Sequence, residues 1–269
     1  METAYEDLGE ECRGIEHEYG DGVHILADPY SMSLLTELGS PSTVQPRFND
    51  LLDTLYRILL QRAVAQELPR TLVECDTNMK KYTPLGVFRG QVIDRSTRAV
   101  TVNVARAGTV PSHICQQILH QVLNPEGVRQ DHVIMERIVD ESGSVTGAAL
   151  QGSKIGGDVD GRYLFFADPM GATGSSLLQV IQHYSEKVGG TPEGIITAHL
   201  IVTPEYVRRM TEAVPGIKIW TVRLDRGASP AEVLGMIPGR DSRESGLNEV
   251  DYIVPGAGGV GEIINNSWI

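Results

Sequence analysis

Positive charge, aromatic rings, cysteine and long apolar runs are all scarce in this 269-residue chain. Lys and Arg total 23 against 35 Asp and Glu, a formal net charge of −12. A surface this acidic repels phosphate backbones, so we expect no nucleic-acid partner. No apolar run approaches the ~18 residues of a bilayer span, so we expect no membrane partner either. A small anion is still an acceptable ligand, because a local group of backbone amides can bind it despite the global field.

The cysteines give no sign of a disulfide framework. Cys12, Cys75 and Cys115 lie far apart and have neither C-x-x-C nor Cys/His spacing, which also argues against a zinc site. The first eleven residues carry five acids, the wrong charge for a targeting peptide. We therefore expect a reduced, cytoplasmic protein. The seven histidines show no paired spacing, and no residue is assigned as a metal ligand.

Apolar runs typical of buried strands alternate with amphipathic segments, which predicts an α/β fold with a largely parallel sheet. We predict strands at 22–29, 83–94, 98–108, 162–168, 194–202, 217–225 and 251–256, and helices at 47–68, 112–123, 175–190 and 203–216. An acidic arm over 1–21 precedes a single domain over 22–269. Residues 228–245, rich in Pro, Gly and charge, are interpreted as a surface insertion.

One stretch, "YLFFADPMGATGSS", joins a predicted strand to a predicted helix and starts at Tyr163. It places Asp168 at the carboxyl end of the strand, where α/β proteins bind ligands. The glycines and hydroxyls that follow offer free amides at a helix N-terminus, a favourable place for an anion. The alternative is an ordinary capped helix, since Ser and Thr are common caps.

Two other segments stand out. "YIVPGAGGVGEI" matches G-x-G-x-x-G at Gly256, Gly258 and Gly261, but only eight residues follow, too few for a dinucleotide-binding unit. It is either a loop that reads the edge of a flat polar molecule or a simple turn. Arg106, in "VARAGTVPS", either clamps a phosphate or forms a surface ion pair. Arg137, in "IMERIVDE", is a weaker candidate.

Together these segments resemble the uracil phosphoribosyltransferase family over roughly residues 22–265. "FFADPMGATGSS" is similar to its ribose-phosphate loop, "ARAG" to its R-A-G turn and "DYIVPGAG" to its base-binding loop. The resemblance implies a type I phosphoribosyltransferase fold, a mostly parallel twisted sheet flanked by helices with a small hood. It also implies transfer of the phosphoribosyl group of 5-phosphoribosyl 1-diphosphate (PRPP) to uracil or a related small base, with release of pyrophosphate.

The resemblance also implies roles for individual residues. Catalysis would fall to Asp168, Arg106 and Arg137, with Asp168 bonding the ribose hydroxyls and Arg106 meeting the pyrophosphate. The base would be read by the backbone of Ile253, Gly258 and Val260, with Tyr252 packing nearby. PRPP would be bound by Arg106, Asp168, Pro169, Met170, Gly171, Ala172, Thr173, Gly174, Ser175 and Ser176. Mg²⁺ would be carried with PRPP, and the family's habit suggests a homodimer or higher homo-oligomer.

The chain departs from the family pattern at several points. Gly259 stands where the family's G-x-G-D loop has an acid on the Mg²⁺–PRPP side, and Ser175 replaces a glycine of the phosphate loop. The segment around Arg137 and Lys154 is longer than the family's mobile segment and lacks its aromatic pair. These departures leave two alternatives open, a regulator that binds PRPP or a nucleotide with little transfer, and a transferase that uses another nitrogen nucleophile.

Overall fold

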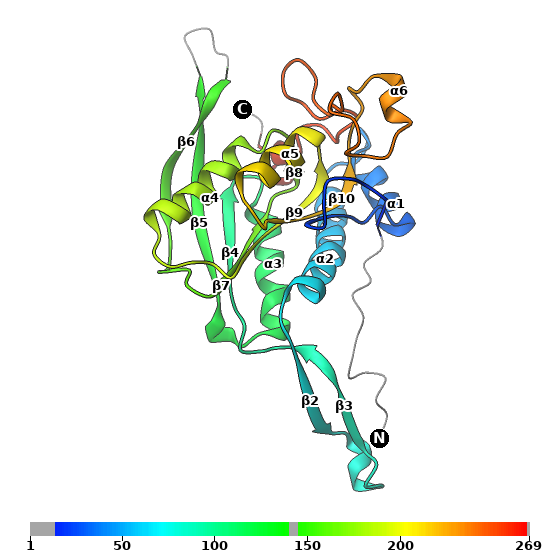
Figure 1. Ribbon diagram of the computed structural model, residues 1–269, viewed down its shortest axis with the longest axis vertical. Helices are drawn as coiled ribbons and strands as arrows, with labels where there is room; N and C mark the ends of the chain where they lie inside the picture. Colours follow the sequence, from blue (N-terminus) through cyan, green and yellow to red (C-terminus); the bar gives the residue numbers. More distant parts are fainter. Residues whose placement is uncertain (1–13, 140–144, 268–269) are drawn as a thin grey trace.

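A single eight-stranded sheet forms the centre of the computed structural model, which describes residues 14–139 and 145–267 (Figure 1). Its order is β1-β10-β9-β7-β4-β5-β6, with β8 beside β9. Every neighbouring pair is parallel except β5 and β6, which confirms the mostly parallel sheet expected from the sequence. The strands are β1 (Val23–Ile25), β4 (Arg98–Ala105), β5 (Val128–Val139), β6 (Val145–Lys154), β7 (Arg162–Ala167), β8 (Met170–Gly171), β9 (Gly194–Val202) and β10 (Lys218–Leu224).

Helices cover both faces of this sheet (Figure 1). Side chains of α1, α2, α3 and α7 share one buried apolar cluster with Phe165, and those of α4 and α5 share another with Phe166. The two adjacent phenylalanines point to opposite faces because strand side chains alternate. The helices are α1 (Pro29–Leu38), α2 (Arg47–Glu67), α3 (Thr109–Val122), α4 (Ser175–Lys187), α5 (Pro204–Ala213), α6 (Ala231–Leu234) and α7 (Val260–Asn265), with 3₁₀ turns at Asn78–Lys81 and Pro125–Gly127.

The longest helix shows how the sequence pattern produces this packing. In α2 the side chains of Leu52, Leu55, Leu59 and Ala63 are fully buried, at the helical spacing seen in the sequence. Each buried leucine contributes about 1.5–3 kcal/mol relative to an exposed one. The helix therefore owes its place to a single apolar face that packs on the sheet.

A two-stranded arm projects from the body at the end opposite α5 and β8 (Figure 1). It pairs β2 (Arg70–Asp76) with β3 (Val87–Ile93) in antiparallel register. Only its second strand was predicted. Leu72 and Leu85 on the arm are exposed, Leu85 at 86%.

One strand prediction for the sheet was wrong. The expected strand at 251–256 is only an isolated bridge between Leu247 and Ile253, because residues around it turn on positive-φ positions at Asp251 and Gly256. The long strand β5, which includes Arg137 and pairs with β6, was not predicted from the sequence. Across the described residues, no helix has the length and apolar character needed to cross a membrane.

Candidate active site

Four neighbouring strands end at one edge of the sheet and are followed directly by polar residues. Arg106 follows β4, Asp168 follows β7, Thr203 follows β9 and Asp225 follows β10. Neighbouring strands lie ~4.8 Å apart, so the four strand ends span roughly 15 Å. This is the edge where open α/β sheets bind ligands. The fold thus brings two of the predicted catalytic residues, Arg106 and Asp168, to adjacent strands.

Carbonyl oxygens of the loop between β7 and α4 accept hydrogen bonds from the junction of β9 and α5. The N–H of Thr203 donates to Gly171 O (3.0 Å), and its hydroxyl donates to Ala172 O (2.6 Å). Arg209 Nη1 donates to Thr173 O (2.8 Å). Three consecutive carbonyls are therefore fixed toward α5.

This arrangement determines where the loop amides point. In a trans peptide the carbonyl and the following N–H point in opposite directions. With three carbonyls turned toward α5, the N–H groups of Ala172, Thr173 and Gly174 are turned away from it. They precede the N-terminus of α4, where the helix dipole also favours an anion. This orientation is the one that the predicted phosphate-binding segment requires.

Two glycines allow the loop to lie this close to α5. A Cβ on Gly171 would stand 2.9 Å from Val202 Cγ1 and 3.0 Å from Tyr206 Cγ, so a larger residue would push the loop off the helix. Gly174, which precedes α4, has φ +75°, a conformation that favours glycine. Both positions belong to the predicted phosphate-binding segment.

Asp168 lies at the start of the loop and accepts a hydrogen bond from the N–H of Met170 (3.1 Å). Burial of the carboxyl group raises its pKa to about 6. Behind it, His199 Nδ1 donates to the Asp168 carbonyl (2.6 Å), and its Nε2 accepts from the Tyr206 hydroxyl (2.6 Å). Burial lowers the pKa of His199 to about 4, so the ring is neutral at pH 7 with its proton on Nδ1.

These supporting residues were missed in the sequence. Thr203, Tyr206 and Arg209 lie in "TPEYVRRM", which shows only the opening of a helix. Thr203 is indeed its N-cap and accepts from the Tyr206 N–H (3.0 Å). The one local signal was the Thr-Pro-Glu start of the helix, and it carries no information about contacts with a loop thirty residues earlier.

Arg106 is exposed and lies in the turn between β4 and α3, after a cis peptide bond with Ala105. Its Nη1 donates to Ser267 Oγ (3.3 Å). Gly108 permits the turn, since a Cβ there would stand 2.8 Å from Val104 O. The guanidinium is thus held near the C-terminal segment while remaining open to solvent.

The predicted base loop is attached to the end of β10. Arg223 pairs with both carboxylate oxygens of Asp225 (2.6 and 2.8 Å). Asp225 accepts from the N–H of Gly256 (2.8 Å), and Arg223 donates to the carbonyl of the same residue (3.1 Å). The Arg223–Asp225 ion pair therefore binds both the N–H and the carbonyl of Gly256. This contact lies at the end of β10, two strands away from β7, which Asp168 follows.

The four predicted base-binding residues differ in their surroundings. Tyr252 is 57% exposed, and Ile253 forms the isolated bridge described above. Gly258 has φ +73°, and its carbonyl accepts from the N–H of Val260 (2.9 Å). The Val260 side chain is buried in the core. The Val260 N–H is therefore already engaged within the loop.

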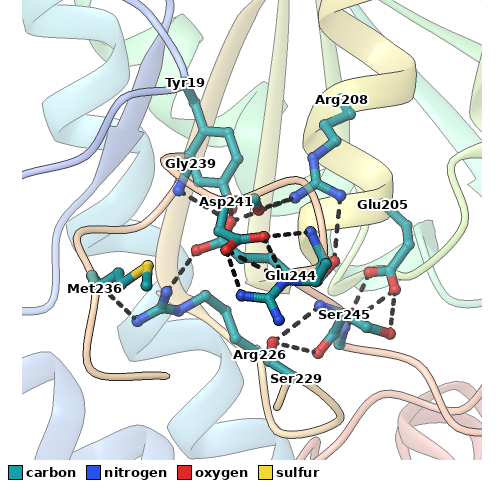
Figure 2. Close-up of polar contacts among 12 residues, drawn as sticks. Tyr19, Glu205, Arg208, Arg226, Ser229, Met236, Gly239, Asp241, Glu244 and Ser245 are labelled. Atoms are coloured by element: carbon teal, nitrogen blue, oxygen red, sulfur yellow. Dashed lines mark hydrogen bonds and ion pairs between the residues drawn. The ribbon is translucent and has the colours of Figure 1, made fainter. Parts of the chain in front are cut away.

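The segment before the base loop is fixed by a buried carboxylate, Glu244 (Figure 2). Glu244 accepts from Arg226 Nη1 (2.5 Å), the Tyr19 hydroxyl (2.5 Å) and the N–H of Gly239 (2.9 Å), and pairs with Arg208 Nη2 (3.5 Å). A surface insertion was expected at 228–245, yet the Glu244 side chain is fully buried. Its charge is compensated by two arginines.

A second contact links α5 to the base loop. Glu205 accepts from the hydroxyl of Ser245 (2.7 Å) and from the N–H of Gly246 (3.0 Å), as Figure 2 shows for Ser245. The carbonyl of Gly246 in turn accepts from the N–H of Val254 (2.8 Å). Helix α5 therefore contacts the phosphate-loop side and the base-loop side of the site.

The remaining candidate, Arg137, lies in β5 opposite Ala148 of β6, and its side chain falls outside the described residues. Within residues 14–139 and 145–267, no three His, Cys, Asp or Glu side chains are close enough to hold a metal ion.

Comparisons with known proteins agree with this geometry. The curated uracil phosphoribosyltransferase of Dictyoglomus thermophilum is 27% identical over 240 residues, covering 89% of this chain and 97% of the relative. The enzyme of that name from Saccharomyces cerevisiae is 27% identical over 235 residues, covering 86% and 89%.

A solved structure, that of the AQ2163 protein from Aquifex aeolicus, has the same fold. It aligns with a TM-score of 0.66 at 18% identity, covering 90% of this chain and 97% of that one. The type I phosphoribosyltransferase-like architecture expected from the sequence is confirmed. The family model described as uracil phosphoribosyltransferase matches residues 25–239, and the chain belongs to this family.

Proposed function

We propose that the protein transfers the phosphoribosyl group of PRPP to uracil, forming UMP and releasing pyrophosphate. A ring nitrogen of the base forms a bond to the ribose C1, the bond from C1 to pyrophosphate breaks, and the nitrogen loses its proton. The observation that carries this proposal is the phosphate loop, with its carbonyls fixed toward α5 and the N–H groups of Ala172, Thr173 and Gly174 turned away from that helix, beside a base loop fixed to β10. Membership of the family supports the same reaction.

In this proposal the residues at the different strand ends bind different parts of PRPP. The amides and hydroxyls that follow Asp168 hold the 5-phosphate, while its carboxylate accepts from the ribose hydroxyls. Arg106 meets the pyrophosphate, with Arg137 assisting. Positive charge develops at the ribose C1 and negative charge on the leaving group, so positioning and charge stabilisation supply most of the rate.

The base is placed on the side of the loop that follows β10. Ile253, Gly258 and Val260 read the base through their backbone, for which the Val260 N–H gives up its hydrogen bond to Gly258 O, and Tyr252 packs nearby. Because the loop is attached through Gly256 to Asp225, its backbone is presented in one conformation. Recognition by a fixed backbone suits a planar base with alternating donors and acceptors.

We propose that Mg²⁺ enters with PRPP. Mg²⁺ keeps several waters and is usually bound by one or two carboxylates together with substrate phosphates. Asp168 is the carboxylate best placed to share it, and the described residues offer no cluster of three ligands that would hold the metal alone. When bound, the metal would neutralise charge on the pyrophosphate.

The partner expected besides the substrates is a second copy of the chain. The β2–β3 arm projects from the body and exposes Leu72, Met79, Tyr82 and Leu85, apolar side chains that a homodimer would cover. A cytoplasmic location, expected from the dispersed cysteines, stays a prediction.

The test is a direct assay. Protein, PRPP, Mg²⁺ and uracil should release pyrophosphate and form UMP, and Asp168→Ala or Arg106→Ala should abolish both products. The alternative, a PRPP-binding regulator, rests on the glycine at position 259 and is not favoured by the family match. Measurable PRPP binding with no turnover on uracil or a panel of other small bases would establish it instead.

A further inference from the structure

The hydroxyl of Ser175, the first residue of α4, accepts two hydrogen bonds. One comes from Thr173 Oγ1 (3.1 Å) and the other, a short one, from Arg209 Nη1. Thr173 Oγ1 itself accepts from the Ser175 N–H (3.3 Å). A serine hydroxyl has two lone pairs and one proton. With both lone pairs occupied, the proton of Ser175 is left to donate to a partner outside the loop.

Arg209 brings the positive charge that the loop lacks. Residues 168–176 contain no Lys or Arg, and the whole chain carries a net charge of −12. Arg209 is exposed and reaches the loop from α5 with Nη1 alone. Its Nε and Nη2 have no hydrogen-bond partner among the described residues, so three of its five N–H donors stay available.

The neighbouring arginine serves a different purpose. Arg208 points to the other side of α5, where it pairs with Glu244 and donates to the carbonyls of Asp241 and Glu244 (Figure 2). Consecutive helical residues are about 100° apart around the axis, so only one of the two can face the phosphate loop. Arg209 contacts Ser175 because its position in α5 turns it toward the phosphate loop, while Arg208 is turned away from that loop.

We infer that Arg209 acts through Ser175 as a positioning residue that selects a phosphomonoester dianion at this loop. By occupying a lone pair of Ser175, it directs the serine proton toward the anion, and its own charge strengthens that hydrogen bond. The inference rests on the proposed function in taking the 5-phosphate of PRPP as the group bound here. It adds one residue, Arg209 of α5, and assigns its effect to Ser175, which stands at a glycine position of the family's loop.

Binding of ribose 5-phosphate, measured by calorimetry on the full chain, tests the inference without turnover. Arg209→Gln should weaken this binding about 10-fold, and Arg209→Lys should recover part of it. Pyrophosphate, which lacks a sugar phosphate, should bind both variants like the unmodified protein. Lys187→Gln, which removes one exposed positive charge from the other end of α4, should leave both ligands unaffected.

A double-mutant cycle separates positioning from simple bracing of the loop. In a Ser175→Gly background, Arg209→Gln should weaken the binding of ribose 5-phosphate by less than about 3-fold, because the serine through which Arg209 acts is absent. An equal cost in both backgrounds would overturn the inference. The inference would also be overturned if Arg209→Gln weakened the binding of pyrophosphate as well and lowered the melting temperature, since Arg209 would then only stabilise the fold.

Steady-state kinetics add a further readout. Arg209→Gln should raise the KM for PRPP with kcat within about 2-fold, as expected for lost ground-state binding. A fall in kcat at unchanged KM would contradict the inference. If the binding pattern holds but no UMP forms, the proposed function fails and the inference stands. If UMP forms while ribose 5-phosphate binds Arg209→Gln normally, the inference fails alone.

Discussion

The carboxylate of Glu262 lies against the backbone of Gly259, such that a Cβ on Gly259 would stand 2.7 Å from Glu262 Oε2. Gly259 is the position at which the family pattern has an acid. Glu262 is half-buried, and its carboxylate has no hydrogen-bond or ion-pair partner among the described residues. A carboxylate oxygen is therefore present close to where an acidic side chain at 259 would begin.

For this reason we expect Gly259→Asp not to raise turnover on uracil. The new side chain would compete with Glu262 for space, and two carboxylates in contact disfavour each other's charge. Overpacking of this kind costs about 1–3 kcal/mol, which thermal denaturation would show as a lower melting temperature. Gly259→Asp combined with Glu262→Ala should recover the lost stability. Higher turnover from the single variant at an unchanged melting temperature would contradict this expectation.

The raised pKa of Asp168 predicts that activity falls as the pH drops through about 6, because only the carboxylate can accept from both ribose hydroxyls. A pH profile of kcat/KM measures this. Asp168→Asn should reduce turnover by at least about 100-fold at pH 7, in line with the loss of a charged transition-state contact. A profile that is flat between pH 5 and pH 7 (roughly one unit either side of the folded pKa) would contradict the assignment.

The raised pKa of Asp168 also affects how the stability of the fold depends on pH. Between about pH 4 and pH 6 the folded state binds the Asp168 proton more tightly than the unfolded chain, so this group favours folding more as the pH is lowered. His199 has the opposite effect, since its pKa falls from 6.5 to about 4 on burial and the unfolded chain then binds more protons. Asp168→Asn should therefore leave a protein whose stability falls more steeply toward acid, as urea denaturation at several pH values can measure.

Breaking the Glu244 cluster should loosen the segment before the base loop. Glu244→Ala leaves Arg226 and Arg208 without their shared counter-charge, at a cost of about 3–5 kcal/mol when one partner of a buried pair is removed. Thermal denaturation and limited proteolysis of residues 235–243 would report it. Glu232→Ala is the matched control, because Glu232 forms an exposed ion pair with Arg243 worth little. Equal effects of the two variants would show that burial of Glu244 is not important.

The arm should decide the oligomeric state. Leu85→Asp places a charge on its most exposed apolar position, and we expect light scattering to show a shift from dimer to monomer. The melting temperature of the body should change little, since the arm projects from the body at the end opposite α5 and β8. A dimer that persists in this variant would place the interface elsewhere.

Local patterns in the sequence were sufficient for most of the sheet and its helices. The helix predicted at 47–68 is α2 (Arg47–Glu67), and the strand predicted at 162–168 is β7, because a periodic apolar face or a short apolar run encodes each of them locally. The prediction that the loop after Asp168 binds an anion also rests on a local pattern, glycines and hydroxyls at the start of a helix.

The residues that hold the site together could not be read in this way. Thr203 and Arg209 act on carbonyls more than thirty residues earlier, and nothing in their local pattern identifies those partners. The strand predicted at 251–256 was wrong for a related reason. Its apolar residues lie in a loop that is attached to Asp225, and among the described residues they form only an isolated bridge, between Ile253 and Leu247.

Helix α5 carries Glu205 and Arg208 toward the base-loop side and Arg209 toward the phosphate loop. Substitution at an outward position such as Glu212 leaves this division intact, but a change in length does not. Deleting one residue between Pro204 and Arg208 would rotate everything beyond it by about 100° and shift it by ~1.5 Å. Evolution and protein engineering are therefore free to change the outer surface of this helix, whereas insertions and deletions within its first two turns would separate the two halves of the site.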